Sequence, residues 1–220
     1  MLVAARDSNI RRFIFAASSS TYGDNTDLPK KEDNIGRPLS PYALTKYVDE
    51  LYADVFAKTY GIEYIGLRYF NVFGRRQDPN SMYAAVIPLF IKQFLNHKQP
   101  KINGDGLNTR DFTYIDNVLH MNMLALNTTN TQAVNQIYNT AGGGRTSINK
   151  LANEIKSCLV QYDFSISDIN PIYGAYRLGD IPHSFASIDK AKQLLGYSPL
   201  VSFQEGLNET VKWYVNNKNY

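Results

Sequence analysis

Two short apolar segments on either side of one long amphipathic helix place the strongest constraint on the fold of this chain. Residues 12–17 (RFIFAA) form a compact apolar run followed by serines, which is typical of a buried strand. Residues 41–60 have an amphipathic helical pattern, and residues 63–70 (EYIGLRYF) are expected to form the next strand. Strand, helix and strand in this order predict a β-α-β unit, and therefore a parallel sheet in an α/β protein.

Capping signals mark the ends of two expected helices. Ser40 can accept a hydrogen bond from the first turn of helix 41–60, where Pro41 suits the first helical position, and Gly61 follows the last turn. Ser202 and Glu205 have the spacing of a capping box at the start of the last helix. Both signals fix helix boundaries before any tertiary contact is considered.

The rest of the chain is expected to be mostly helical, with a soft domain boundary near residue 75. Beyond that position strand–helix alternation gives way to a region with glycine-rich loops. The remaining expected elements are the last turns of a helix at 1–7, helix 84–97, strand 101–103, and helices 117–127, 147–161, 189–195 and 203–216. We therefore predict one domain within residues 1–75 and a second within residues 76–220.

Composition excludes several classes of protein and site. The net charge of +3 is small and no block of like charges occurs, so neither nucleic acid nor a membrane surface is an expected partner. The single cysteine, Cys158, rules out an internal disulfide and lies in an apolar helical pattern, so we expect it in the core. The three histidines are scattered, and we predict no metal site. No apolar run is long enough to span a bilayer and no signal peptide is evident, so the expected location is the cytoplasm.

One constellation of side chains suggests acid–base chemistry. Ser18 to Gly23 (SSSTYG) follow the first expected strand, where ligands bind in open α/β sheets. Tyr42 and Lys46 are four residues apart, so they share one face of the following helix. An ammonium group stabilises a nearby phenolate, so such a tyrosine can exchange a proton with a substrate hydroxyl. A tyrosine and lysine at this spacing can also be an ordinary exposed pair, and the upstream serines favour the functional interpretation.

This combination resembles the extended short-chain dehydrogenase/reductase family, and within it the NAD-dependent epimerase/dehydratase group. Three more segments are similar to motifs of the group: residues 67–74 (LRYFNVFG), residues 103–116 (NGDG…RDFTYID) and residues 177–180 (RLGD). The resemblance covers nearly the whole chain. It implies an α/β fold, with residues 1–75 as the C-terminal part of a Rossmann-like NAD-binding domain. Residues 76–220 would form mainly a smaller α/β domain that binds a UDP-sugar, with some segments returning to the Rossmann-like domain.

The resemblance also assigns roles to individual residues. Ser18, Tyr42 and Lys46 would be catalytic, and the cofactor NAD would be contacted by Tyr42, Lys46, Phe70 and Val72. Arg110 and Arg177 would pair with the diphosphate, whose oxygens match the planar fork of a guanidinium group. The full set of expected substrate contacts is Ser19, Ser20, Asn71, Val86, Asn103, Arg110, Arg177, Asp180 and Ser184.

Two features discriminate among members of the group. Dehydratases and decarboxylases carry acidic side chains beside the catalytic serine or threonine, whereas this chain has Ser19 and Ser20 there. In the family, the position of Ser184 borders the C2 substituent of the sugar, and a small residue admits an N-acetyl group. The run from Ser18 through Arg76 also resembles bacterial UDP-N-acetylglucosamine 4-epimerases of surface-polysaccharide pathways. The expected reaction is interconversion of UDP-GlcNAc and UDP-GalNAc; the alternatives are a UDP-glucose 4-epimerase or related oxidoreductase, and a non-catalytic remnant that binds a UDP-sugar.

The phosphate-binding motif of the family is the feature that this sequence lacks. A strand followed by G-x-x-G-x-x-G and a helix would hold the cofactor pyrophosphate, and no such motif precedes Ser18. We therefore expect that roughly the first third of the enzyme is absent, that the sheet has an exposed edge, and that this chain alone binds NAD poorly and is inactive. Members of the family commonly form homodimers through two long helices, and helix 41–60 would be one of them. Because the other would be cut short, we do not expect this chain to form that dimer.

Overall fold

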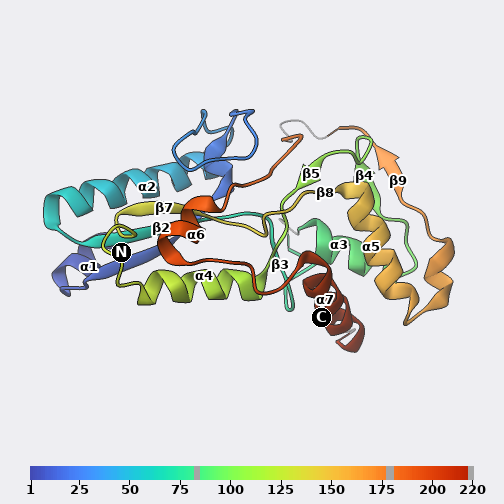
Figure 1. The fold of residues 1–220 in the computed structure, drawn as a ribbon. Coiled ribbons are helices and arrows are strands. Elements are labelled where there is room, and N and C mark those ends of the chain that lie inside the picture. The colour runs from blue at the N-terminus through green and yellow to red at the C-terminus, as the bar shows by residue number, and fades with distance from the viewer. Residues whose placement is uncertain (82–84, 177–180, 218–220) are drawn as a thin grey trace. The chain divides into compact units, whose positions relative to one another are not determined.

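The chain folds into two compact units in a computed structural model that describes residues 1–81, 85–176 and 181–217 (Figure 1). Unit 1 consists of Met1–Phe70, Asp116–Gly143 and Ala186–Leu200. Unit 2 consists of Asn71–Ile115, Gly144–Phe185 and Val201–Tyr220. The chain therefore passes from one unit to the other several times, and each unit is assembled from segments that are distant in sequence.

Unit 1 is built on a three-stranded parallel sheet in the order β1 (Arg12–Ser18), β2 (Glu63–Tyr69) and β7 (Gln136–Thr140). The predicted α/β class and the parallel pairing of the first two strands are thereby confirmed. Gly66 lies at the centre of the sheet, where an added Cβ would come within 2.5 Å of the Ile137 side chain and 2.7 Å of the Phe15 ring. A larger residue there would push these neighbours out of their packed positions.

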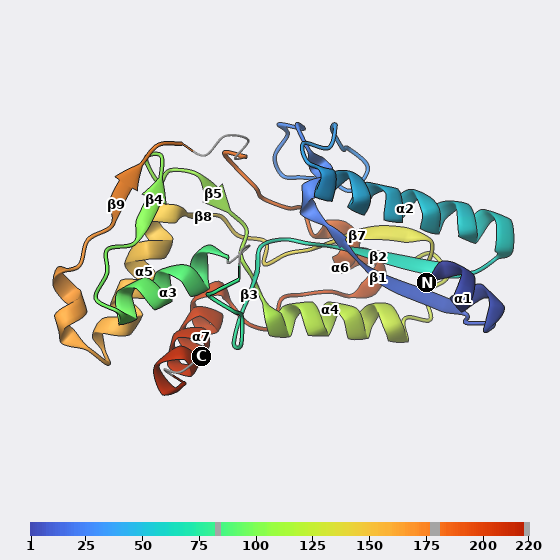
Figure 2. The same cartoon turned by 180° about the vertical axis from the view of Figure 1, so that it is seen from behind.

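Helices cover both faces of this sheet. Helix α2 (Pro41–Tyr60) lies on one face together with the short α1 (Leu2–Asp7), and α4 (Ile115–Asn127) lies on the other (Figures 1 and 2). Helix α6 (Asp189–Leu195) and the 3-10 turn η1 (Ser19–Tyr22) complete the unit. The core between them contains Tyr22, Ile65, Leu67, Phe70, Met121, Ala125, Ala133, Tyr138, Ala141, Ala186, Ile188, Ala191, Leu195 and Tyr197.

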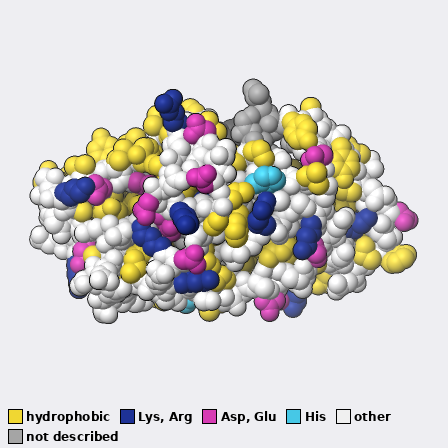
Figure 3. All heavy atoms as spheres, turned by 45° about the horizontal axis from the view of Figure 1, so that its top comes forward, with side chains coloured by type: hydrophobic (Ala, Val, Ile, Leu, Met, Phe, Trp, Pro, Cys, Tyr) yellow, Lys and Arg dark blue, Asp and Glu magenta, His cyan; other side chains and the backbone are white. Residues whose placement is uncertain are grey.

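Helix α2 keeps an apolar outer face. Leu44, Leu51, Tyr52 and Val55 are each about half exposed or more. In Figure 3 hydrophobic side chains gather at the upper left, in the region of α2. The opposite side of the helix, which includes Ala53, is buried against the sheet.

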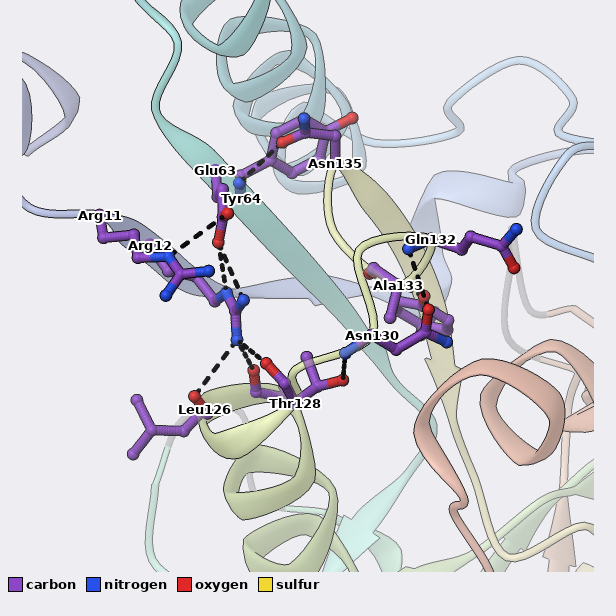
Figure 4. Close-up of polar contacts among 12 residues, drawn as sticks. Arg11, Arg12, Glu63, Tyr64, Leu126, Thr128, Asn130, Gln132, Ala133 and Asn135 are labelled. Atoms are coloured by element: carbon purple, nitrogen blue, oxygen red, sulfur yellow. Dashed lines mark hydrogen bonds and ion pairs between the residues drawn. The ribbon is translucent and has the colours of Figure 1, made fainter.

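A single arginine closes the end of unit 1 where the strands begin (Figure 4). The Nη1 atom of Arg12 donates to the carbonyl oxygens of Ala125, Leu126 and Thr128, at 3.1, 3.3 and 2.9 Å. Its Nε donates to the Glu63 carboxylate at 3.0 Å. Arg12 thus joins the starts of β1 and β2 to the last carbonyl groups of α4, which a cation stabilises.

Unit 2 packs helices α3 (Val86–Leu95), α5 (Ile148–Val160) and α7 (Phe203–Asn216) around a second core. Short strand pairs surround them: β3 (Val72–Phe73) with β6 (Thr113–Tyr114), β4 (Lys101–Asn103) with β9 (Ile172–Gly174), and β5 (Thr109–Arg110) with β8 (Thr146–Ser147), alongside the 3-10 turn η2 (Phe164–Asp168). Cys158 is buried in this core, as its sequence pattern predicts. No helix in the described parts of the chain has the length and hydropathy that a membrane span requires.

The capped helices follow the sequence predictions closely. Ser40 Oγ accepts from the Ala43 amide and Gly61 is left-handed with φ 73°, so α2 has the expected bounds. Ser202 and Glu205 form the expected capping box of α7. The helix expected at 84–97 is shorter, and it ends at Leu95, followed by His97 at φ 52°. Strand β7 was not predicted, because its sequence (QIYNT) contains too few apolar residues to be recognised.

Candidate functional site

The end of β1 orients one serine hydroxyl. Ser18 caps the turn η1, so its Oγ accepts from the Ser20 amide at 3.2 Å and from the Ser20 hydroxyl at 2.9 Å. The Thr21 hydroxyl donates to the Ser18 carbonyl oxygen. Because Ser20 supplies two donors to Ser18 Oγ, the remaining Ser18 proton can be donated to another oxygen. Ser18 and Ser20, both proposed from sequence, therefore form one hydrogen-bonded group.

Helix α2 brings Tyr42 and Lys46 to the same strand end, since it packs on both β1 and η1. Tyr42 is 58% exposed in the first turn. Lys46 Nζ donates to the Ala16 carbonyl oxygen on β1 at 3.0 Å and lies 3.3 Å from the Asp49 carboxylate. An ammonium group has three N–H donors, so one is not used by these two contacts. Ser18, Tyr42 and Lys46 thus belong to one region of unit 1.

The neighbouring Tyr22 has a different environment from Tyr42. It is buried, and its hydroxyl donates to Asn139 Oδ1 at 2.6 Å. Burial raises the pKa of Tyr22 to about 12, so its hydroxyl stays protonated at neutral pH. Of the two tyrosines beside the serine cluster, Tyr42 is the one placed to exchange protons with a ligand.

A network of buried polar side chains holds this region together; we call Glu32, Glu50, Arg68, Tyr22 and Asn139 the Arg68 network. Arg68 on β2 donates through Nε and Nη2 to the two carboxylate oxygens of Glu50 on α2, at 2.8 and 2.7 Å. Its Nη1 donates to the Glu32 carbonyl oxygen, and its guanidinium lies 4.8 Å from the Tyr22 ring centre. The Glu32 carboxylate in turn accepts a hydrogen bond from the backbone N–H of Asn139 at 2.9 Å. The network therefore fixes α2 and the segment before it against the sheet.

A pocket of about 560 Å³ opens beside Lys46, between α1, β1 and α2. Its walls include the apolar side chains of Phe13, Phe15, Tyr52 and Phe56. Apart from Lys46 and Asp49 it offers few polar groups, so it does not have the chemistry of a sugar or phosphate site.

The turn after β2 contains the next group of expected contacts. Phe70 is fully buried in unit 1, and its amide donates to the Thr140 carbonyl oxygen at 3.1 Å. In unit 2, Asn71 has φ 34° and its Nδ2 donates to the Asp111 carbonyl oxygen at 3.0 Å, while its own carbonyl oxygen accepts from the Thr113 amide. Val72 follows in β3 and is partly buried. The positive φ of Asn71 suits an asparagine, and its side chain contributes to holding this turn.

The remaining expected contacts belong to unit 2. Val86 is the first residue of α3, Asn103 the last of β4 and Arg110 the last of β5. Ser184 lies in a segment, Ile181–Phe185, that runs alongside β5 and that we call the strap. Arg177 and Asp180, also expected to bind substrate, lie outside the described residues.

The strap and β5 place Arg110 and Ser184 on a common face. Thr109 pairs with His183 in a parallel bridge, with hydrogen bonds from Thr109 N to Pro182 O at 2.9 Å and from Ser184 N to Thr109 O at 3.0 Å. Side chains alternate along extended chains, so Thr109 and His183 lie on one face, and Arg110 and Ser184 on the other. Arg110 Nη1 also donates to the Pro182 carbonyl oxygen at 3.2 Å. The structure therefore brings together two residues that are far apart in sequence and that were both expected to contact substrate.

Sequence reasoning missed the residues that support these groups. Two of them lie close to predicted site residues: Glu50 follows Lys46 by four residues, and Thr109 directly precedes Arg110. Neither sequence position indicates which residue the side chain contacts. The partners, Arg68 and His183, are 18 and 74 residues away. A buried charge within an apolar strand was the one available signal for Arg68, because a buried charge requires a partner.

Comparisons with known proteins agree on one family. Residues 1–141 match the NAD dependent epimerase/dehydratase family. A UDP-N-acetylglucosamine 4-epimerase from Methanobrevibacter ruminantium M1, solved with UDP-N-acetylmuramic acid, is 42% identical with a TM-score of 0.89, over 98% of this chain and 66% of that one. The UDP-glucose 4-epimerase of Thermotoga maritima, solved with UDP-glucose, is 35% identical with a TM-score of 0.90, over 99% of this chain and 67% of that one.

A protein described as a putative UDP-glucose 4-epimerase of Methanocaldococcus jannaschii is 38% identical over 218 residues, which are 99% of this chain and 67% of that protein. The chain spans between 63% and 67% of the length of the first curated relatives it matches. The family profile, the relatives and the parallel α/β fold lead to the same conclusion: the chain belongs to the NAD dependent epimerase/dehydratase family.

Proposed function

We propose that this chain supplies the proton-transfer residues and the sugar-nucleotide contacts of an NAD-dependent 4-epimerase that interconverts UDP-GlcNAc and UDP-GalNAc. The observation that carries the proposal is the region at the end of β1. There the Ser18 hydroxyl is oriented by its contact with Ser20. Helix α2, which carries the exposed Tyr42 and also Lys46, packs against the same end of β1. A pathway that builds a surface polysaccharide would use the product.

In the proposed reaction Tyr42 accepts the proton of the sugar C4 hydroxyl, and Ser18 donates a hydrogen bond to the same oxygen. Bound NAD would supply the hydride acceptor for C4 and then the hydride donor. The 4-keto sugar formed between the two steps rotates within the site, so that the opposite face of C4 is reduced. Tyr42 then returns the proton to the C4 oxygen. No second acid–base group is required, which suits Ser19 and Ser20 as neutral neighbours.

The residues present fit one end of the cofactor. Lys46 is partly exposed and has an N–H donor beyond its contacts with Ala16 and Asp49, so it can hydrogen-bond a ribose hydroxyl. Backbone groups of Phe70 and Val72 are proposed neighbours of the nicotinamide. Because the sequence has no G-x-x-G-x-x-G, none of its residues is assigned to the pyrophosphate.

The substrate proposal rests on unit 2. Arg110 offers a guanidinium group to the diphosphate, and Ser184 on the same face leaves room for an N-acetyl group. The relative from Methanobrevibacter ruminantium M1 supports this choice, since it is named as a UDP-N-acetylglucosamine 4-epimerase and holds an N-acetylated sugar nucleotide. A UDP-glucose 4-epimerase is the second candidate, because several of the similar proteins carry that name.

Titration calorimetry of the purified chain with UDP-GlcNAc, UDP-glucose and ADP-glucose tests the proposal. We expect UDP-GlcNAc to bind more tightly than UDP-glucose, and ADP-glucose not to bind. Equal affinity for ADP-glucose would rule out a UDP-sugar site, and a preference for UDP-glucose would favour the second candidate. NMR of UDP-GlcNAc incubated with chain and NAD checks turnover; if conversion occurs, the Tyr42→Phe variant should abolish it.

A further inference from the structure

The hydroxyl of Thr109 is the centre of the contacts between β5 and the strap. It lies 3.0 Å from His183 Nδ1, and Arg145 Nη2 donates to it at 3.4 Å. Both backbone groups of Thr109 also bond the strap, to Pro182 and from Ser184. Every polar group of this threonine is therefore engaged, and three of these contacts join it to the strap, while Arg145 and Arg110 Nη1, which donates to the Thr109 carbonyl oxygen at 3.0 Å, supply the others.

The chemistry of Arg145 fixes the direction of one of these bonds, and the tautomer of His183 sets the direction of the other. Arg145 can only donate, so the Thr109 oxygen accepts from it. The Thr109 proton is then available for His183 Nδ1, which accepts it in the neutral tautomer with the proton on Nε2. A valine at position 109 would keep the β-branched shape but provide neither the donor nor the acceptor.

The register of the strap decides what faces the substrate. Because successive residues alternate between faces, a slip by one residue would replace Ser184 with His183 or Phe185 beside Arg110. Only the bridge at Thr109 and His183 joins the strap to β5 among the described strand pairings. A two-residue strand such as β5 has few backbone bonds of its own, so a side-chain contact has a large influence on register.

We propose that Thr109, through its hydroxyl contact with His183, is a positioning residue that sets which strap side chain borders the sugar C2 substituent. Thr109 lies on the opposite face from Arg110 and Ser184, so it acts through the strap and not by touching the sugar. This inference rests on the proposed function, in which Ser184 admits the N-acetyl group.

Five variants of the full chain test the inference: Thr109→Val, Thr109→Ser, His183→Ala, the double variant Thr109→Val/His183→Ala and the control Thr113→Val. Serine keeps the hydroxyl and should retain the parental behaviour. Thr113 is a suitable control because it is also a strand threonine of unit 2, but its buried hydroxyl has no hydrogen-bond partner among the described residues. Loss of that hydroxyl should leave the strap unchanged.

The first measurement is amide hydrogen exchange at Ser184, whose N–H bonds Thr109. We expect Thr109→Val and His183→Ala each to raise the exchange rate about 5- to 10-fold, the effect of losing one hydrogen bond. The double variant should be no faster than either single variant, because both remove the same contact. Unchanged exchange in Thr109→Val would overturn the inference, even if the chain binds no ligand.

The second measurement is the ratio of the dissociation constants for UDP-glucose and UDP-GlcNAc. We expect this N-acetyl preference to fall at least about threefold in Thr109→Val, while Thr109→Ser and Thr113→Val stay within about twofold of the parent. Faster exchange without a change in the ratio would show a purely structural contact and overturn the positioning role. Failure of the parent chain to bind either sugar nucleotide would instead contradict the proposed function.

Discussion

Arg68 and Glu50 join β2 to α2 by a two-bonded ion pair in which both side chains are nearly inaccessible, with exposures of 3% and 6%. The Coulomb attraction between such groups offsets the loss of hydration only while both partners are present. The same helix carries Tyr42 and Lys46, so this pair also fixes the rotation of the proposed catalytic residues relative to the sheet.

Removal of one partner of this pair should destabilise unit 1 severely. We expect Glu50→Ala to lower the free energy of unfolding by about 3–5 kcal/mol, because it leaves a buried guanidinium without its carboxylate. The double variant Arg68→Met/Glu50→Leu should lose less than Glu50→Ala, since no unpaired charge remains. Urea denaturation followed by circular dichroism measures both.

The exposed pair on the same helix provides the control. Asp54 and Lys58 lie 2.6 Å apart at the surface. Asp54→Ala should therefore cost less than about 1 kcal/mol. A double Arg68→Met/Glu50→Leu variant destabilised as much as Glu50→Ala would contradict the account of a coupled buried pair.

Glu32 should make stability depend on pH. Burial raises the pKa of Glu32, and the hydrogen bond from the Asn139 amide and the charges of Lys190 and Arg68 oppose this shift only in part. The folded chain thus holds this proton to a higher pH than the unfolded chain. The stability that the protonated group contributes is fully present below its ordinary pKa of 4.5 and is lost as pH rises through the raised value.

Glu32→Gln tests this dependence, because glutamine keeps an acceptor for Asn139 but does not titrate. We expect the stability of the variant relative to the parent to increase as pH rises from 4.5, measured by urea denaturation at a series of pH values. The exposed Glu209→Gln should show no such trend. A parent and variant with parallel pH profiles would contradict the prediction.

Arg12 should stabilise the end of α4 as well as the sheet. Arg12→Met removes the donor to three carbonyl groups and the ion pair with Glu63, so we expect a loss of about 2–3 kcal/mol and faster hydrogen exchange in the last turn of α4 (Figure 4). Arg11 is the matched control: its side chain is 78% exposed and lies 3.5 Å from the same carboxylate. Arg11→Met should change stability by less than about 0.5 kcal/mol, and an equal effect of both substitutions would refute the special role of Arg12.

Ser184→Tyr should reverse the proposed preference for an N-acetylated sugar. The larger side chain would occupy the space assigned to the acetamido group, so affinity for UDP-GlcNAc should fall about tenfold more than affinity for UDP-glucose. Ser184→Ala keeps the site small and should retain the preference. Calorimetry with both sugar nucleotides measures the difference, and equal losses would remove the gating role of this position.

Local signals were sufficient to predict the helices and the first two strands. Ser40, Pro41 and Gly61 define α2 because caps act within a few residues of the chain. Strand β7 escaped prediction because Asn139 is polar, yet it is fully buried and satisfied by Glu32, Lys30 and Ser187. No local pattern encodes those partners, since they come from other segments of the chain.

The same limit applies to the candidate site. The serines, Tyr42 and Lys46 lie close in sequence, so their spacing alone predicted one group. The shared face of Arg110 and Ser184 depends on the pairing of Thr109 with His183 across 74 residues. Such a pairing follows from the tertiary fold and cannot be read from periodicity.

The order in which unit 1 is assembled has a consequence for its synthesis. Its three stretches, Met1–Phe70, Asp116–Gly143 and Ala186–Leu200, alternate with those of unit 2. A growing chain therefore displays β1, β2 and the apolar side of α2 long before the ribosome has made β7 and α6. The incomplete unit 1 exposes apolar surface during that interval, so we expect a change in translation speed between residues 71 and 185 to alter the yield of folded protein.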